Sequence, residues 1–469
     1  MKMSLATVAK IVAGELIPTS AAAIEISAVD IDTRRLPPQS LFVALAGEHS
    51  DGHDHLAAAQ QAGAVAAVVR QAQTSAEVQT GMLAQIVVAD SAAALQQLAL
   101  FCRQHYHGKV AAITGSNGKT TVKEMLYSIA TAAMGEDKVL RSHGNFNNHL
   151  GVPLMLLQLN PLQQIALLEA GMDHRGELTA LSALIQPQVA LINNAQRAHI
   201  GNFSSLHEIA CAKGELLSGL AANGCAVLNA DDAHFSLWCE LAADKKIISF
   251  GQAQQADIHG TFTEEGIIIN GVSIRLAVAG AHNKMNALAA AAAAHALGLP
   301  TAAVVQGLSR YQGAAGRLTV HRVSPQLTLI DDTYNANLDS TLAGLAVLAT
   351  TAAANNTQAV LVMGDMLALG EQTQEAHDAI VAACRQQQIL LLGWGAQMQQ
   401  ALARDTNNAN SDNRHFTDRA LLIEEMLRLA QTKKITALVK GSRGMQMEKI
   451  VNAIVATSAT VSRVEQGVN

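Results

Sequence analysis

Ile113-Thr-Gly-Ser-Asn-Gly-Lys-Thr-Thr121 is the stretch that decides how this chain folds. An apolar run at residues 110–114 leads into it, and apolar residues at helical spacing follow it from Val122 to Ile129. The pattern predicts a strand that passes through a glycine-rich loop into a helix. In such a connection the backbone N–H groups of the loop and the amino terminus of the helix surround phosphate oxygens. We therefore expect a nucleotide-binding α/β domain around this loop.

The side chains of the loop indicate how a nucleoside triphosphate is held. Lys119 is expected to reach the β- and γ-phosphates, and the hydroxyl of Thr120 to bind Mg²⁺. The pattern is shorter than the full Walker A motif, because Ile113 stands where its first glycine belongs. A match to G-x-x-G-K-[ST] arises by chance in roughly one or two such chains per hundred, so an ordinary glycine turn is the alternative. The predicted nucleotide-binding residues of the loop are Gly115, Ser116, Asn117, Gly118, Lys119, Thr120 and Thr121.

The composition excludes several classes of protein. The chain has 469 residues, of which 49% are apolar and 15% charged, which is enough for two or three buried cores. A formal net charge of -6 and no basic stripe argue against a nucleic-acid partner. The five cysteines show no C-x-x-C pairing, and no apolar run is long enough for membrane insertion. We expect a cytoplasmic protein.

Alternating apolar runs and helical stretches divide the chain into three α/β domains, at residues 1–107, 108–313 and 314–469. The first is expected to be a small α/β unit with strands at residues 41–45, 64–69 and 85–89 and a helix from residue 91 to about residue 105. The second is expected to have strands at residues 110–114, 165–168, 189–192 and 226–228. The third is expected to have a Rossmann-like parallel sheet with strands at residues 327–330, 359–363, 389–392 and 437–439.

Two details refine the central and C-terminal domains. Residues 258–280 alternate and turn at Asn270-Gly271, which predicts an antiparallel hairpin and therefore a mixed central sheet. The alanine run at residues 289–294 predicts a buried helix. A linker at residues 313–316 leads into the third domain.

Three further side chains fall where a bound nucleotide needs them. Glu169 ends an apolar strand, at the edge where open α/β sheets bind ligands, so its carboxylate is a candidate for a metal that bridges the phosphates. His199 and Lys213 add an imidazole and an amine from a later loop and helix. Each has an ordinary alternative: a solvated strand end, a satisfied core or surface histidine, and a solvated helix lysine.

The order and spacing of several motifs resemble the Mur ligase family over nearly the whole chain. These motifs are the loop at residues 114–121, Gly144-Asn-Phe-Asn-Asn-His-Leu-Gly-Val-Pro153, the Glu169 strand, Ala198-His-Ile200, Ala212-Lys-Gly-Glu215, His282-Asn-x-x-Asn286 and Gly316-Arg317. The resemblance implies an ATP-dependent amide ligase. Its N-terminal domain would hold the UDP end of the substrate, its central domain ATP, and its C-terminal domain a dipeptide.

The resemblance also implies site residues. The residues that match the UDP-sugar-binding segment are Thr33, Arg34, Asp51 and His53, and threonine at 33 stands where many relatives have serine. Asn147 and Asn148 match a polar segment near the sugar-peptide and phosphates. The remaining nucleotide-binding matches are Asn283, at the adenine, and Arg317 and Asp332, which close on ATP from the C-terminal domain.

Residues 331–337, 364–370 and 440–443 are similar to those of the family members that join D-alanyl-D-alanine to UDP-N-acetylmuramoyl-tripeptide. Asn335 and Asn337 are the matched substrate-binding residues. The Asp-Asn-Pro-Arg element of the sibling that adds a diamino acid does not occur in the sequence. The implied reaction is phosphorylation of a carboxylate by ATP, followed by attack of the dipeptide amine on the acyl phosphate.

The cofactors implied by the resemblance are ATP and Mg²⁺, with a carbamate on Lys213 that turns a cation into a ligand for a second Mg²⁺. The implied catalytic residues are Lys119, Glu169, His199 and Lys213. The implied metal-binding residues are Thr120, Glu169, His199 and Lys213.

Other functions stay open from the sequence. Another Mur-type or a folylpolyglutamate-type ligase shares the central domain, but the latter lacks the elements at residues 32–34 and 51–53. A P-loop regulatory or transport protein would leave the polar strand ends of the third domain without a task. We expect a monomer, and no motif distinguishes diaminopimelate from lysine as the third residue of the tripeptide.

Overall fold

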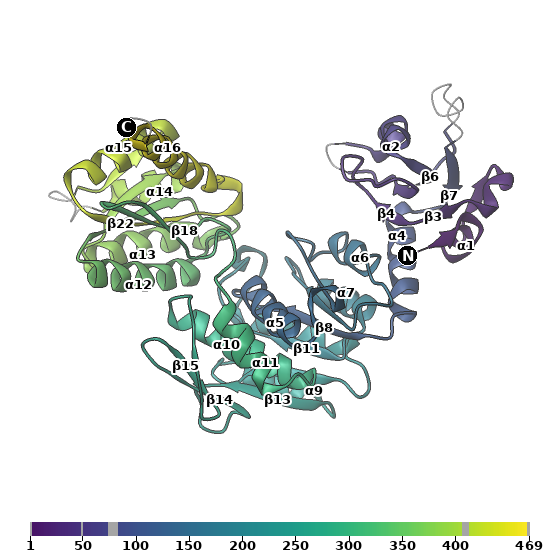
Figure 1. The fold of residues 1–469 in the computed structure, drawn as a ribbon, viewed down its shortest axis with the longest axis horizontal. Coiled ribbons are helices and arrows are strands. Elements are labelled where there is room, and N and C mark those ends of the chain that lie inside the picture. The colour runs from purple at the N-terminus through teal and green to yellow at the C-terminus, as the bar shows by residue number, and fades with distance from the viewer. Residues whose placement is uncertain (1, 48–49, 74–82, 406–411, 467–469) are drawn as a thin grey trace.

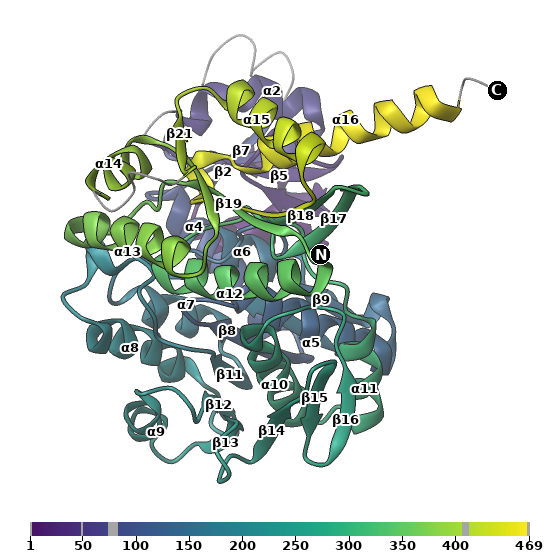
Figure 2. The same cartoon turned by 90° about the vertical axis from the view of Figure 1, so that its left-hand side faces the viewer.

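The computed structural model describes residues 2–47, 50–73, 83–405 and 412–466. Three α/β domains form an open V, with the N-terminal and C-terminal domains on the two arms and the central domain at the base (Figure 1). Figure 2 shows the last helix, α16 (Glu448–Gln466), extending away from its domain. No helix in the described part of the chain is both long and apolar enough to span a membrane.

The N-terminal domain is built on a five-stranded sheet in the order β2-β7-β6-β5-β4, parallel except for β2. Its strands are β2 (Glu15–Ile17), β4 (Ala28–Asp30), β5 (Ser40–Val43), β6 (Ala64–Val69) and β7 (Ala84–Val87), beside a small pair of β1 (Met3–Ser4) and β3 (Glu25–Ile26). Its helices are α1 (Leu5–Ile11), α2 (Leu56–Ala62) and α4 (Ser91–Gln104). The three predicted strands and the last helix are confirmed. The short strands β2 and β4 were not predicted, because they are partly exposed and lack an apolar run.

The central domain has a nine-stranded sheet in the order β16-β15-β14-β13-β12-β11-β8-β10-β9. Its strands are β8 (Lys109–Thr114), β9 (Val139–Arg141), β10 (Ile165–Glu169), β11 (Val189–Ile192), β12 (Cys225–Asn229), β13 (Lys246–Gly251), β14 (Ile258–Phe262), β15 (Gly266–Ile269) and β16 (Val272–Arg275). The strands are parallel up to β14, and β14, β15 and β16 are antiparallel to one another. The predicted mixed sheet is therefore confirmed. So is the hairpin, because Asn270 and Gly271 both have the positive φ that a tight two-residue turn needs.

Helices cover both faces of the central sheet. They are α5 (Lys119–Met134), α6 (Gly151–Leu156), α7 (Glu177–Ile185), α8 (Leu206–Gly214), α9 (Phe235–Ala242), α10 (Ala281–Ala296) and α11 (Thr301–Arg310). The predicted alanine helix is α10, and its buried alanines lie between α5 and strands β12 to β14. Small side chains there let the helices and the sheet approach closely.

The C-terminal domain has a six-stranded sheet in the order β17-β18-β22-β19-β20-β21. Its strands are β17 (Thr319–Ser324), β18 (Leu327–Asp332), β19 (Gln358–Gly364), β20 (Leu390–Trp394), β21 (Arg414–Phe416) and β22 (Ile435–Lys440), and its other helices are α12 (Leu338–Asn355), α13 (Thr373–Gln386), α14 (Ala396–Arg404) and α15 (Arg419–Thr432). The four predicted strands are confirmed, but the sheet is not wholly parallel, because β17 runs antiparallel to β18 at the edge. β17 alternates between half-buried and exposed residues, so it has no continuous apolar run.

The two neighbours of the central domain contact it differently. Helix α4 of the N-terminal domain packs against α6 and α7, and its buried Arg103 donates to the carbonyls of Ile185 and Gln186 at the end of α7. The C-terminal domain contacts the central domain where Gly201 meets Gly370, so closely that a Cβ on Gly201 would lie 2.6 Å from the Gly370 nitrogen.

Candidate active site

A cavity of about 1630 Å³ lies between the central and C-terminal domains. Residues 116–121 of the phosphate loop, the end of β10 and the start of α10 line it from the central domain. The residues that follow β18 line it from the C-terminal domain. The carboxyl ends of parallel strands therefore converge on one space, as the sequence predicts for a ligand site in α/β sheets.

Three asparagine side chains outside the phosphate loop stabilise its conformation. Gly118 has a φ of 83°, and a Cβ there would lie 2.5 Å from Asn193 Nδ2 and 2.3 Å from Asn286 Oδ1. Asn193 Nδ2 also donates to the Asn117 carbonyl at 2.9 Å, and Asn194 Oδ1 accepts from the Asn117 N–H at 2.9 Å. The loop backbone is thus preorganised in front of the α5 amino terminus, where phosphate oxygens bind.

Sequence reasoning did not assign these supporting asparagines. Asn193 and Asn194 were visible only as polar residues at the end of a strand, and Asn286 only as the last residue of a motif. Their role depends on β11 lying beside β8, which places the end of β11 under the loop.

Lys119 lies over the loop, and its Nζ donates to the Gly115 carbonyl at 2.6 Å. Burial lowers the pKa of Lys119, and the nearby Glu169 carboxylate opposes that shift. The amine is therefore close enough to the loop to contact a phosphate bound on the loop amides.

Thr120, Glu169 and Arg317 come together across the two domains. The Thr120 hydroxyl donates to Glu169 Oε2 at 3.1 Å and accepts from Arg317 Nη2 at 2.9 Å. Arg317 also lies over the ring of Tyr334, 4.1 Å from its centroid. A cation from the C-terminal domain therefore reaches the phosphate loop.

The oxygens of Thr120 and Glu169 fit a magnesium ion. Adjacent ligands of an octahedral Mg²⁺ with bonds of about 2.1 Å lie about 3 Å apart, close to the 3.1 Å between Thr120 Oγ1 and Glu169 Oε2. Within the described residues, no group of three or more His, Cys, Asp or Glu side chains is arranged to hold a metal. Two protein oxygens suit Mg²⁺ in a phosphate site, because phosphates and water supply its other ligands.

His199 lines the same cavity, whereas Lys213 is not among its lining residues and is linked to the site through its charge interactions with Lys119 and His199. His199 Nδ1 is 3.0 Å from Asp173 Oδ1, and burial lowers the pKa of His199 while Asp173 opposes that shift. Lys213 is buried on α8, and its pKa is held well below the ordinary lysine value by burial, with a smaller contribution from the charge of Lys119. The amine of Lys213 is therefore neutral at a lower pH than that of an exposed lysine.

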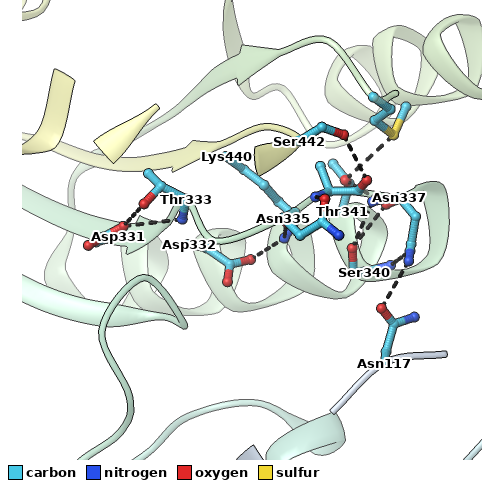
Figure 3. Close-up of polar contacts among 12 residues, drawn as sticks. Asn117, Asp331, Asp332, Thr333, Asn335, Asn337, Ser340, Thr341, Lys440 and Ser442 are labelled. Atoms are coloured by element: carbon cyan, nitrogen blue, oxygen red, sulfur yellow. Dashed lines mark hydrogen bonds and ion pairs between the residues drawn. The ribbon is translucent and has the colours of Figure 1, made fainter. Parts of the chain in front are cut away.

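The C-terminal wall is a connected polar network (Figure 3). The buried Lys440 pairs with Asp332 at 2.5 Å and donates to the Asn335 carbonyl at 2.9 Å. Asn337 caps α12 in a capping box with Ser340, and its Nδ2 donates to Asn117 Oδ1 of the phosphate loop at 2.9 Å. Two of the predicted residues, Asp332 and Asn337, are thus fixed by protein partners.

The predicted adenine and sugar-peptide residues also line the cavity. Asn283 is buried at the start of α10, and its Nδ2 donates to the Ala279 carbonyl. Asn148 Oδ1 accepts from the Gly151 N–H at 2.9 Å just before α6, and Asn147 lies beside Gly171.

The four predicted residues of the N-terminal domain lie outside this cavity. Arg34 is paired with Asp32, which lowers the pKa of Asp32 to about 2. His53 uses both ring nitrogens inside the protein: Nδ1 is 2.6 Å from Asp51 Oδ1, and Nε2 accepts from the Arg70 N–H. The structure thus does not bring Thr33, Arg34, Asp51 and His53 together with the phosphate loop.

Family models match all three domains. The Mur ligase middle domain matches residues 113–294, the Mur ligase glutamate ligase domain residues 316–443, and the Mur ligase catalytic domain residues 25–103.

Individual proteins match over the full chain. The UDP-N-acetylmuramoyl-tripeptide--D-alanyl-D-alanine ligase of Escherichia coli (strain K12) is 36% identical over 466 residues, covering 97% of this chain and 98% of that protein. A crystal structure of MurF from Acinetobacter baumannii has a TM-score of 0.85 at 32% identity, covering 97% of this chain and 99% of that one. The MurF ligase of Thermotoga maritima in complex with ADP has a TM-score of 0.74 at 21% identity, covering 92% and 98% of the two chains, and shares the fold.

Proposed function

The chain belongs to the Mur ligase family, and from this premise we propose that it joins D-alanyl-D-alanine to UDP-N-acetylmuramoyl-tripeptide, with cleavage of ATP to ADP and phosphate. The observation that carries the proposal is the shared cavity, in which the phosphate loop faces the C-terminal residues 331–337. The similarity over 97% of the chain to a ligase of that name supports it.

The chemistry follows from the weakness of a carboxylate as an electrophile. A carboxylate oxygen of the tripeptide attacks the γ-phosphorus, the bond from that phosphorus to the bridging oxygen breaks, and ADP leaves. The dipeptide amine then attacks the acyl carbon, loses a proton and forms the C–N bond, and inorganic phosphate leaves. Lys119 and Arg317 hold the phosphate oxygens during the transfer.

We assign the protein ligands of Mg²⁺ to Thr120 and Glu169, and Asn283 to the adenine. Bound there, the metal neutralises charge on the phosphate oxygens. Lys213 carries a carbamate in the active enzyme: burial lowers the pKa of its amine and so favours the neutral form, which is the form that reacts with CO₂. The carbamate and His199 serve a second metal-binding position.

We assign the UDP end of the substrate to residues 1–107, ATP to residues 108–313 and the dipeptide to residues 314–469. Thr33, Arg34, Asp51 and His53 then bind one end of a long substrate, and Asn147 and Asn148 lie along its path to the phosphates. Asn335 and Asn337 face the dipeptide. The protein works as a monomer.

The proposal is tested by measuring phosphate release from ATP. Both UDP-tripeptide and D-alanyl-D-alanine are required for release, and the new product has the mass of the UDP-pentapeptide. Rapid hydrolysis of ATP without either substrate would instead indicate a P-loop switch protein. Comparing diaminopimelate-containing and lysine-containing UDP-tripeptides identifies the third residue.

A further inference from the structure

Lys123 is a buried cation with no task in the proposed reaction. It lies on α5 one turn after Lys119, and its side chain is 2% exposed. Its Nζ is 2.5 Å from the Ser142 carbonyl and 3.0 Å from a carboxylate oxygen of each of Glu124 and Glu169. A buried ammonium is costly unless it is paired, so these contacts account for its retention at this position.

The two oxygens of the Glu169 carboxylate have different partners. Oε1 pairs with Lys123, and Oε2 accepts from the Thr120 hydroxyl. The Glu169 backbone N–H donates to Ser142 Oγ at 3.1 Å. Both the main chain and the carboxylate of Glu169 are thus held by the pair Lys123 and Ser142.

The charges around Lys123 balance within the protein. Arg141 pairs with Glu124 at 2.5 Å and stacks on Tyr127, 3.7 Å from its ring centroid. Two cations and two carboxylates therefore alternate from Arg141 to Glu169. Without Lys123, this row of four charged side chains would contain one carboxylate without a compensating cation. A buried ion pair is costly to break because it leaves such an unpaired charge.

We propose that Lys123 is a positioning residue: it holds Glu169 Oε1 so that Oε2 alone is presented beside Thr120 to the magnesium ion of the nucleotide. The inference rests on the proposed function for the identity of that ligand. When a group that contacts a metal-binding side chain and fixes its orientation is removed, metal affinity or activity typically falls by about 10- to 100-fold. Lys123 borders the cavity, but its amine is directed to Ser142, Glu124 and Glu169, so in this proposal it acts through Glu169.

The test is Lys123→Met in the full-length protein, with ADP binding measured by calorimetry in excess EDTA and again across a Mg²⁺ titration. We expect the ADP affinity in EDTA to match the wild type, and the Mg²⁺ concentration for half-maximal enhancement of binding to rise about 10-fold or more. Turnover should show the same rise in Mg²⁺ requirement. Lys109→Met is the matched control, because Lys109 Nζ also donates to a backbone carbonyl, that of Leu297, outside the cavity.

Two results would overturn the inference. An unchanged Mg²⁺ requirement would show that Lys123 does not position Glu169 for the metal. An equal loss of ADP affinity with and without Mg²⁺ would show that Lys123 contacts the nucleotide directly. If Lys123→Met does not fold, Lys123→Gln keeps a donor amide, and the same two measurements decide. ADP binding needs neither UDP-tripeptide nor dipeptide, so failure of the proposed ligase reaction is recognised separately.

Discussion

The central domain meets its two neighbours through junctions of different chemistry. On the N-terminal side, α4 packs along α6 and α7 and the buried Arg103 closes the end of α7. On the C-terminal side, the contacts to the phosphate loop are polar side chains, Arg317 to Thr120 and Asn337 to Asn117. Water can replace polar contacts at little cost, whereas separating packed helices exposes apolar surface. We therefore expect the first junction to act as a fixed support and the second to open and close.

The largest expected effect is that of Lys119→Ala, beside the C-terminal junction. We expect turnover to fall by about 10²–10³, equivalent to about 2.7–4 kcal/mol, because a contact to the transferring phosphoryl group is lost. The loop backbone is held by Asn193 and Asn194, so the unfolding temperature should stay near that of the wild type. Near-normal turnover would refute the assignment of the phosphate loop.

Lys213→Ala should lose most of the activity, by about tenfold or more, if Lys213 carries the carbamate. Added formate or acetate should restore part of the rate by filling the vacated anion position. A solvated helix lysine would instead give nearly wild-type rates and no response to formate.

Lys213 should also cost stability at neutral pH. The folded-state pKa of Lys213 lies well below the unfolded value near 10.5. The stability cost of burying its amine is therefore absent above pH 10.5 and grows as the pH falls toward the folded-state pKa. In CO₂-free buffer Lys213→Met should therefore be more stable than the wild type at pH 7, because the cost of neutralising a buried amine is removed. The difference should shrink as the pH approaches 10.5, and a constant difference across pH would exclude this origin.

Arg103→Met tests the fixed junction. The buried carbonyl of Ile185 and the half-buried carbonyl of Gln186 lose their donor, which should lower the free energy of unfolding by about 1–3 kcal/mol. The kinetic constants should stay close to those of the wild type, because Arg103 lies outside the cavity. Urea unfolding and steady-state kinetics on the same preparation check both. A large loss of turnover at unchanged stability would reverse the assignment of the two junctions.

The smallest expected effect is a change of shape. Adding a non-hydrolysable ATP analogue with UDP-tripeptide should reduce the radius of gyration in small-angle scattering, as the C-terminal domain swings on the linker at residues 313–316. An unchanged radius would count against this hinge.

The sequence predicts most of the strands that are buried on both faces. Continuous apolar runs identified β8, β10, β11 and β12, and the helical spacing after Thr121 identified α5. The edge strands β9, β17 and β21 were not predicted, because they are short or half-exposed and have no long apolar run. The interior strand β13 was also not predicted, although most of it is buried.

The candidate site was predictable only where its residues lie in local motifs. The phosphate loop and Glu169 could be read from the chain alone. Lys123 and Arg103 look like ordinary helix cations in sequence, and their burial depends on which strand and which helix end lie opposite them. Partners of this kind are set by tertiary packing, which one sequence does not display.

The contact between Gly201 and Gly370 offers a way to inhibit such an enzyme without competing for ATP or peptide. Neither residue has a side chain, so the spacing between the central domain and the C-terminal arm is set there by bare backbone. A small wedge bound at this point would keep the C-terminal arm from reaching the phosphate loop. A substitution that replaces either glycine with a larger residue, and so prevents the inhibitor from binding, would itself separate the two domains. The resistance mutation would therefore inhibit the enzyme in the same way as the drug.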